Sequence, residues 1–134
     1  MSLYDLYATD PDLEKGGIIL NYGEGIRIKI ARAGGANMDF AKSLERHMRP
    51  YRKRLDTGTL PEDVAQDIFR LVFAESVVKD WENVTDRDKK PMKFSVDNCV
   101  QLFKDLPDLF ADVRESASTV SNFRDEEIED DVKN

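Results

Sequence analysis

The sequence contains little of what catalytic, metal-binding or membrane proteins require. Among its 134 residues there is one cysteine, Cys99, and one histidine, His47. A single cysteine cannot form an internal disulfide, and these two residues alone cannot build a zinc site. No apolar run approaches the roughly 18–20 residues that cross a bilayer, and residues 1–5 lack the basic and apolar regions of a signal peptide. We therefore expect a soluble cytosolic protein with no enzymatic activity, no metal and no cofactor.

Two segments bear a faint likeness to ligand-binding loops and fail on spacing. A calcium loop needs oxygen ligands at positions 1, 3 and 5 and a glycine at position 6. Counted from Asp86, position 5 is Lys90 and position 6 is Pro91. Gly34-Gly35 precedes a helical pattern but lacks the lysine and the Ser/Thr that follow in a phosphate-binding loop. We interpret the first segment as a solvated turn and the second as a helix break.

Charge is distributed unevenly along the chain. The net charge is -7, yet residues 1–60 hold ten Lys/Arg against eight Asp/Glu, and residues 61–134 hold ten against nineteen. Residues 42–54 contain six basic residues and one acid, whereas residues 125–134 contain six acids and one lysine. The overall negative charge argues against non-specific nucleic-acid binding, which depends on neutralising phosphates. We expect residues 125–134 to be an acidic, disordered tail.

Residues 18–30 predict a β-hairpin. Two β-rich runs flank a short glycine-bearing loop, in the order Ile18-Ile19-Leu20-Asn21-Tyr22, Gly23-Glu24-Gly25 and Ile26-Arg27-Ile28-Lys29-Ile30. Ile26, Ile28 and Ile30 alternate with charged residues and should share one face. Because a lone hairpin is marginal in water, this isoleucine face must pack on helices of the chain or on a partner.

Apolar residues at three- and four-residue spacing predict about four helices. The first begins at Asn37, as its cap, and should break at Pro50. The second is capped by Thr59 and extends to about Asp80, a third begins at Ser95, and a fourth follows residue 105. Residues 83–93 form a polar loop. The expected fold is α+β, mainly α-helical with an N-terminal β-hairpin, in a single domain of residues 1–124.

Two surfaces leave their interpretation open. The six cations of residues 42–54 can be the solvated face of an amphipathic helix, a docking face for an acidic partner segment, or a surface that tracks phosphates. No aromatic residue is interleaved on that face to stack bases, which argues against the last. Phe69, Phe73 and Trp81 are interpreted mainly as core, with a groove for a partner's amphipathic helix as the alternative.

Several segments, taken in order, resemble the tail assembly chaperones of long-tailed (siphovirus-type) bacteriophages. The similarity covers roughly residues 15–124. The segments that carry it are Gly25-Ile26-Arg27-Ile28-Lys29-Ile30-Ala31-Arg32-Ala33-Gly34-Gly35-Ala36-Asn37, Phe40-Ala41-Lys42, Arg49-Pro50-Tyr51-Arg52, Trp81-Glu82-Asn83-Val84-Thr85-Asp86, Phe94-Ser95, Asp105-Leu106-Pro107-Asp108-Leu109-Phe110 and Asn122-Phe123-Arg124. The chaperones carry glycine at the positions of Asn83 and Lys89, so the loop between helices should differ here.

The resemblance implies a non-catalytic helper in the host cell cytoplasm, absent from the mature virion. Such a protein binds and solubilises the tape measure protein and helps recruit the tail tube protein. Exposed apolar patches also favour homo-oligomers, whereas no membrane partner is expected. The expected client contacts are Phe69, Phe73 and Trp81, with the docking cations Arg46, Arg49 and Arg52. The alternatives are a small structural adaptor or completion protein of the phage neck or tail, and a small nucleic-acid-binding regulator that uses residues 42–54.

Overall fold

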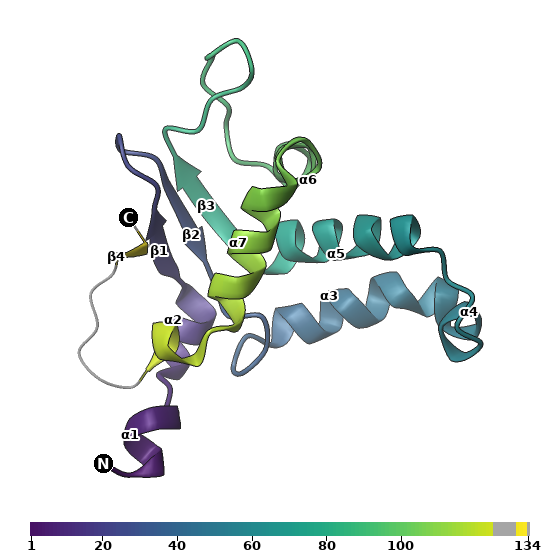
Figure 1. Cartoon of the computed structure of the whole chain (residues 1–134), viewed down its shortest axis with the longest axis horizontal. Helices are drawn as coiled ribbons and strands as arrows, with labels where there is room; N and C mark the ends of the chain where they lie inside the picture. The colour runs from purple at the N-terminus through teal and green to yellow at the C-terminus, as the bar shows by residue number, and fades with distance from the viewer. Residues whose placement is uncertain (125–130, 134) are drawn as a thin grey trace.

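The computed structural model describes residues 1–124 and 131–133 and has the expected α+β fold (Figure 1). The elements in chain order are α1 (Leu3–Tyr7), α2 (Pro11–Gly16), β1 (Ile18–Asn21), β2 (Arg27–Ile30), α3 (Met38–Met48), a 3-10 turn (Arg49–Tyr51), α4 (Arg52–Asp56), α5 (Glu62–Ser76), β3 (Val78–Glu82), α6 (Val96–Asp105), α7 (Pro107–Ser118), a second 3-10 turn (Val120–Phe123) and β4 (Asp131–Lys133). The four expected helices correspond to α3 with α4, α5, α6 and α7. The short helices α1 and α2 were not expected.

The predicted hairpin is confirmed and forms part of a sheet. The strands β1 and β2 pair antiparallel with Ile18 opposite Ile30 and Leu20 opposite Ile28. All four of these side chains are buried. The strand order is β3-β2-β1-β4, with β2 antiparallel to both β1 and β3. The isoleucine face therefore covers the core of this chain, as the alternation predicts.

The expectation of an unbroken helix to Asp80 is wrong. The helix α5 ends at Ser76, and β3 pairs with β2 so that Trp81 lies opposite Ile28. Strand pairing at this point satisfies backbone groups along the second edge of β2, which a two-stranded hairpin would leave exposed. The β-branched Val78 is the first residue of the strand and is buried, consistent with the β-propensity of such residues.

The helix boundaries confirm two predicted signals and correct two others. Pro50 lies in the 3-10 turn that separates α3 from α4, and Ser95 Oγ accepts a hydrogen bond from the Asn98 backbone N–H at 3.0 Å. Thr59 does not cap α5, because Pro61 occupies the N-cap position and the Thr59 hydroxyl bonds to that of Thr57. Asn37 occupies the N-cap position of α3 without a capping bond.

The expected disordered tail, residues 125–134, lies outside the described residues except for 131–133. Those three residues form β4, which pairs parallel to β1 and places Asp131 beside Ile19. The free edge of β1 presents unpaired backbone groups, which is the physical reason that a further strand can add there.

Residues 31–37 connect three parts of the fold. Backbone N–H groups of Ala31, Arg32 and Ala33 donate in turn to carbonyls of Val77, Glu14 and Ala117, at 2.8, 3.0 and 2.9 Å. The Arg32 guanidinium also forms an ion pair with the Glu14 carboxylate, which is 4% exposed. The segment thereby fixes α2, the end of α5 and the end of α7 relative to the sheet.

Asn37 and Gly35 complete this connection. The Asn37 side-chain amide donates to the carbonyls of Arg32 and Ser76, at 2.8 and 3.0 Å, so it links the segment to the end of α5. Gly35 has φ of 54°, and a Cβ at this position would overlap the Glu14 carboxylate. The glycine is therefore required both by the backbone conformation and by the close approach of the buried acid.

Candidate protein-interaction surface

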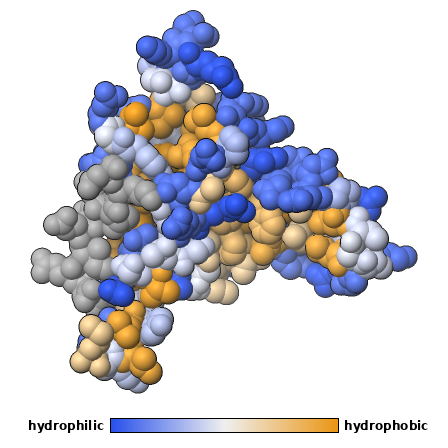
Figure 2. Space-filling view, in the orientation of Figure 1, coloured by the Kyte–Doolittle hydropathy of each residue, from blue (hydrophilic) through white to orange (hydrophobic). Residues whose placement is uncertain are grey.

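An open apolar groove lies where α7 meets the pair of helices α3 and α5. Figure 2 shows hydrophobic surface at this junction. The groove has a volume of about 460 Å³, within the roughly 300–1,000 Å³ of ligand-binding clefts. Its lining residues are Ala33, Phe40, Phe69, Phe73, Ala111, Arg114, Glu115 and Ser118. We call this surface the α7 groove.

The floor of the α7 groove is a set of packed aromatic rings. Phe73 is only 5% exposed, and its ring makes edge contacts with Phe40 and Phe110, each at a centroid distance of 5.6 Å. Phe69 lies one helical turn before Phe73 on α5 and is half-buried. Ala111 on α7 is exposed. The groove exists because the small side chains beside the rings, Ala33, Ala111 and Ser118, do not fill the space between the helices.

Arg114 places a positive charge in this apolar setting. Its Cζ lies 4.8 Å from the centroid of the Phe110 ring, one helical turn earlier on α7. The Arg114 Nε atom is buried and has no hydrogen-bond partner within residues 1–124 and 131–133, and no ion pair to Arg114 is found there either. A buried donor without a partner costs about 1–3 kcal/mol, so a ligand would gain if it supplied an acceptor and its docking turned the guanidinium toward that acceptor. The α7 groove is therefore suited to apolar side chains accompanied by one acceptor.

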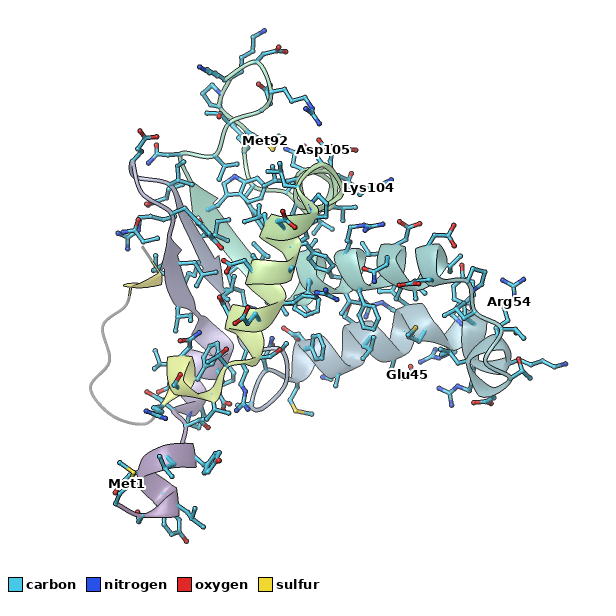
Figure 3. The ribbon with its side chains drawn as sticks, viewed as in Figure 1. Met1, Glu45, Arg54, Met92, Lys104 and Asp105 are labelled. Atoms are coloured by element: carbon cyan, nitrogen blue, oxygen red, sulfur yellow. The ribbon has the colours of Figure 1, made fainter. Side chains whose placement is uncertain are left out.

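The predicted docking cations lie on the outer side of α3 and beyond it, each paired with an acid. Arg49 and Arg52 both contact Glu45, and Arg46 contacts Glu75. Figure 3 shows Glu45 on α3, toward the end that lies far from the sheet. The hydrogen bond from Arg49 is the main cause that lowers the pKa of the Glu45 carboxyl. The three arginine side chains remain 54–68% exposed. Their role in docking stays a prediction, with much of their charge already compensated.

The three predicted contact aromatics lie in different environments. Phe69 lines the α7 groove and Phe73 forms its floor. Trp81 lies on β3 outside the groove and is 8% exposed. Its indole N–H donates to the Met92 carbonyl at 2.8 Å, and its ring makes an edge contact with Phe94 at 5.2 Å. Trp81 and Phe73 are therefore mainly core residues with small exposed parts, and their role in client contact stays a prediction.

A second apolar surface lies at the start of the chain. Four large apolar residues of residues 1–7 are exposed, namely Met1 (100%), Leu3 (71%), Tyr4 (83%) and Tyr7 (65%). Figure 3 shows Met1 at the outer end of α1, away from the sheet and the helices. We call residues 1–7 the α1 arm. The arm and the α7 groove are two apolar surfaces of the described residues on which an interaction can be based.

The described residues contain no arrangement typical of a catalytic or metal site. No three His, Cys, Asp or Glu side chains converge as metal ligands within residues 1–124 and 131–133. Cys99 is fully buried, and burial raises the pKa of its thiol to about 12, so it is not a nucleophile at neutral pH. None of the helices in the described part of the chain combines the length and the hydropathy needed to cross a membrane.

Comparison with protein families places the chain among prophage proteins. A family model described as YdaY prophage protein matches residues 35–134. The chain belongs to the YdaY prophage protein family. The match includes α3, α5 and α7 and thus every lining residue of the α7 groove except Ala33. It does not include the α1 arm or the β1–β2 hairpin. No curated protein and no solved structure matches the chain.

Proposed function

We propose that this YdaY-family protein is a phage tail assembly chaperone. It binds and solubilises the tape measure protein, helps recruit tail tube subunits, and acts in the host cell cytoplasm without entering the mature virion. It makes or breaks no covalent bond. The membership in a prophage family agrees with a phage-related role, and the ordered resemblance of residues 15–124 supports the more specific role.

The observation that carries the proposal is the α7 groove. An amphipathic client helix binds by placing side chains one helical turn apart into an apolar groove. The α7 groove provides a half-buried phenylalanine wall, an aromatic floor and small residues that leave room for such side chains. Covering these residues would also remove apolar surface of the client from water, which is how a chaperone of this kind keeps a client soluble.

The connection between β3 and α6 departs from the chaperones in residue type but agrees with their glycines in backbone conformation. Asn83 and Lys89, which stand where the chaperones carry glycine, have φ of 59° and 61°. These are the two residues of this connection in the left-handed region, where glycine is favoured and other residues are uncommon. The backbone conformation therefore fits the glycine pattern of the chaperones, although other residues stand at these two positions.

Co-expression with the tape measure protein of the same prophage tests the proposal. We expect the wild-type chain to raise the soluble fraction of the tape measure protein and to co-purify with it. Phe69→Glu should abolish this effect, because it places a charge on the apolar wall of the α7 groove. Leu55→Glu is the matched control, since Leu55 is 41% exposed on α4 and does not line the groove.

Two results distinguish the chaperone from a structural adaptor of the phage neck or tail. An equally insoluble tape measure protein with and without the wild-type chain would refute the chaperone function. Mass spectrometry of purified particles addresses the structural alternative, because an adaptor of the neck or tail would be present at a fixed copy number per virion. We expect the chain to be absent from the particles.

A further inference from the structure

We propose that the α1 arm of one copy docks into the α7 groove of a second copy, so that the chain associates with itself through two different surfaces. This inference goes beyond the chaperone function, although it uses the same groove. It accounts for both unpartnered apolar surfaces at once. Self-docking would also keep the groove covered until a client competes for it.

The α1 arm is preformed for docking. Asp5 and Ser2 form a capping box, in which the Ser2 backbone N–H donates to Asp5 Oδ2 at 3.0 Å and the Asp5 backbone N–H donates to Ser2 Oγ at 3.3 Å. An isolated helix of this length is marginal in water, so the capping box favours the helical conformation that exposes Leu3, Tyr4 and Tyr7. Preorganised side chains lose less conformational entropy on binding, which favours a docking role for so short a helix.

The two surfaces offer one pair of opposite charges, Asp5 on the arm and Arg114 in the groove, which Glu115 also lines. The α1 arm carries one acidic residue, Asp5, among its exposed apolar side chains. Its Oδ1 atom accepts no hydrogen bond from the described residues. The α7 groove contains Arg114, whose Nε lacks a hydrogen-bond partner within the same part of the chain. An Asp5–Arg114 contact would satisfy the buried donor with a charge-assisted hydrogen bond.

The occupant of the groove must come from a second copy, because the base of the arm is fixed. The Arg124 guanidinium donates to the Leu6 carbonyl at 3.3 Å, and the Asp10 backbone N–H donates to the Phe123 carbonyl at 2.8 Å. Thr9 also pairs with Arg124 as an antiparallel bridge. Figure 1 shows α1 beyond α2, away from the junction of α7 with α3 and α5. To reach its own groove, the arm would have to break these contacts.

The interface has a heterologous geometry. Each copy inserts its arm into the groove of one neighbour and receives the arm of another neighbour in its own groove. Such contacts either close into a ring of copies or continue into a larger open assembly. A few anchoring side chains make a small interface, so the association should be reversible and concentration-dependent. We expect the average mass of the wild-type chain to rise with protein concentration.

Complementation between two variants tests the inference. The arm variant Leu3→Ser/Tyr4→Ser keeps an intact groove, and the groove variant Ala111→Glu keeps an intact arm. Ala111 is exposed, so a charge there should not unfold the chain. By light scattering after size-exclusion chromatography, each variant alone should be monomeric. An equimolar mixture should form a 1:1 dimer and nothing larger, because only one arm–groove contact remains possible.

Two further variants make the test specific. Leu106→Ser removes an equally apolar side chain that is 48% exposed and lines neither surface, and it should associate as the wild type does. Arg114→Gln should weaken association about tenfold, because it removes the charge that pairs with Asp5. A wild-type chain that stays monomeric at every concentration would overturn the inference, as would a variant mixture that stays monomeric or an arm variant that associates normally. No client is present in this experiment, so its failure would leave the chaperone test unaffected.

Discussion

The ion pair between Glu14 and Arg32 gives the sharpest prediction about stability. Glu14 lies on α2 and is 3% exposed. Its Oε2 contacts the Arg32 guanidinium, and its Oε1 accepts a hydrogen bond from the Ala36 backbone N–H at 3.3 Å. In Glu14→Gln the side-chain volume is kept, but the amide N–H groups face the guanidinium and the arginine loses its counter-charge.

The expected loss follows from the burial of the pair. Removing one partner of a buried ion pair costs about 3–5 kcal/mol. The Arg32 side chain is 22% exposed and can partly regain water, so we expect about 2–3 kcal/mol. At roughly 2.1 cal/mol/K of unfolding entropy per residue, 134 residues give about 0.28 kcal/mol/K, and Tm should fall by about 7–11 °C.

Thermal unfolding followed by circular dichroism at neutral pH measures this effect. Glu45→Gln is the matched control, because Glu45 also pairs with arginines but on the exposed side of α3. Exposed pairs contribute little to stability, so this control should hardly change Tm. If Glu14→Gln lowered Tm no more than Glu45→Gln does, the segment of residues 31–37 would not be held by its buried pair.

Three other predictions concern the Cys99 thiol, the Tyr22 hydroxyl and the basic residues of segment 42–54. Cys99 should resist a thiol reagent at pH 8 until the chain unfolds, because a thiol with a pKa of about 12 is ionised in about one molecule in ten thousand. Burial, together with the hydrogen bond to Asp112, raises the pKa of Tyr22. The stability that the neutral Tyr22 hydroxyl contributes should be complete below about pH 10 and should fall at higher pH. The free energies of unfolding of wild type and Tyr22→Phe, measured by urea unfolding, should therefore converge above about pH 10. In a mobility-shift assay at about 50 and 200 mM salt, no salt-sensitive DNA binding is expected, since Glu45 and Glu75 already pair the arginines.

The hairpin and the helix break were predictable because their signals are local. Alternation in residues 26–30 and the nearby glycines specify a two-stranded pairing without reference to the rest of the chain. Pro50 lacks the backbone N–H that a continuing helix needs, so it breaks the helix in any surroundings. Features of this kind depend on neighbouring residues alone.

The third strand was not predictable from the same reasoning. Val78 and Trp81 continue the helical spacing of α5, so periodicity alone assigns them to a longer helix. What selects the strand is the vacant edge of β2, about fifty residues earlier in the chain. The cap assigned to Thr59 failed for a related reason, because the neighbouring hydroxyl of Thr57 offered a competing partner at 2.8 Å.

The α7 groove shows why an interaction surface is harder to predict than a core. The spacing of Phe69 and Phe73 on α5 correctly indicated an apolar face, but residue types cannot say which part of such a face remains uncovered. That depends on the position of α7. The Ala33 backbone N–H donates a hydrogen bond of 2.9 Å to the Ala117 carbonyl and so holds the end of α7. The groove is lined by two charged residues, Arg114 and Glu115. Sequence reasoning normally assigns such residues on an amphipathic helix to the solvated side. The same segment, residues 31–37, therefore connects to the end of α7, which forms one side of the groove. Variants that loosen this segment should affect the proposed client binding and self-association together.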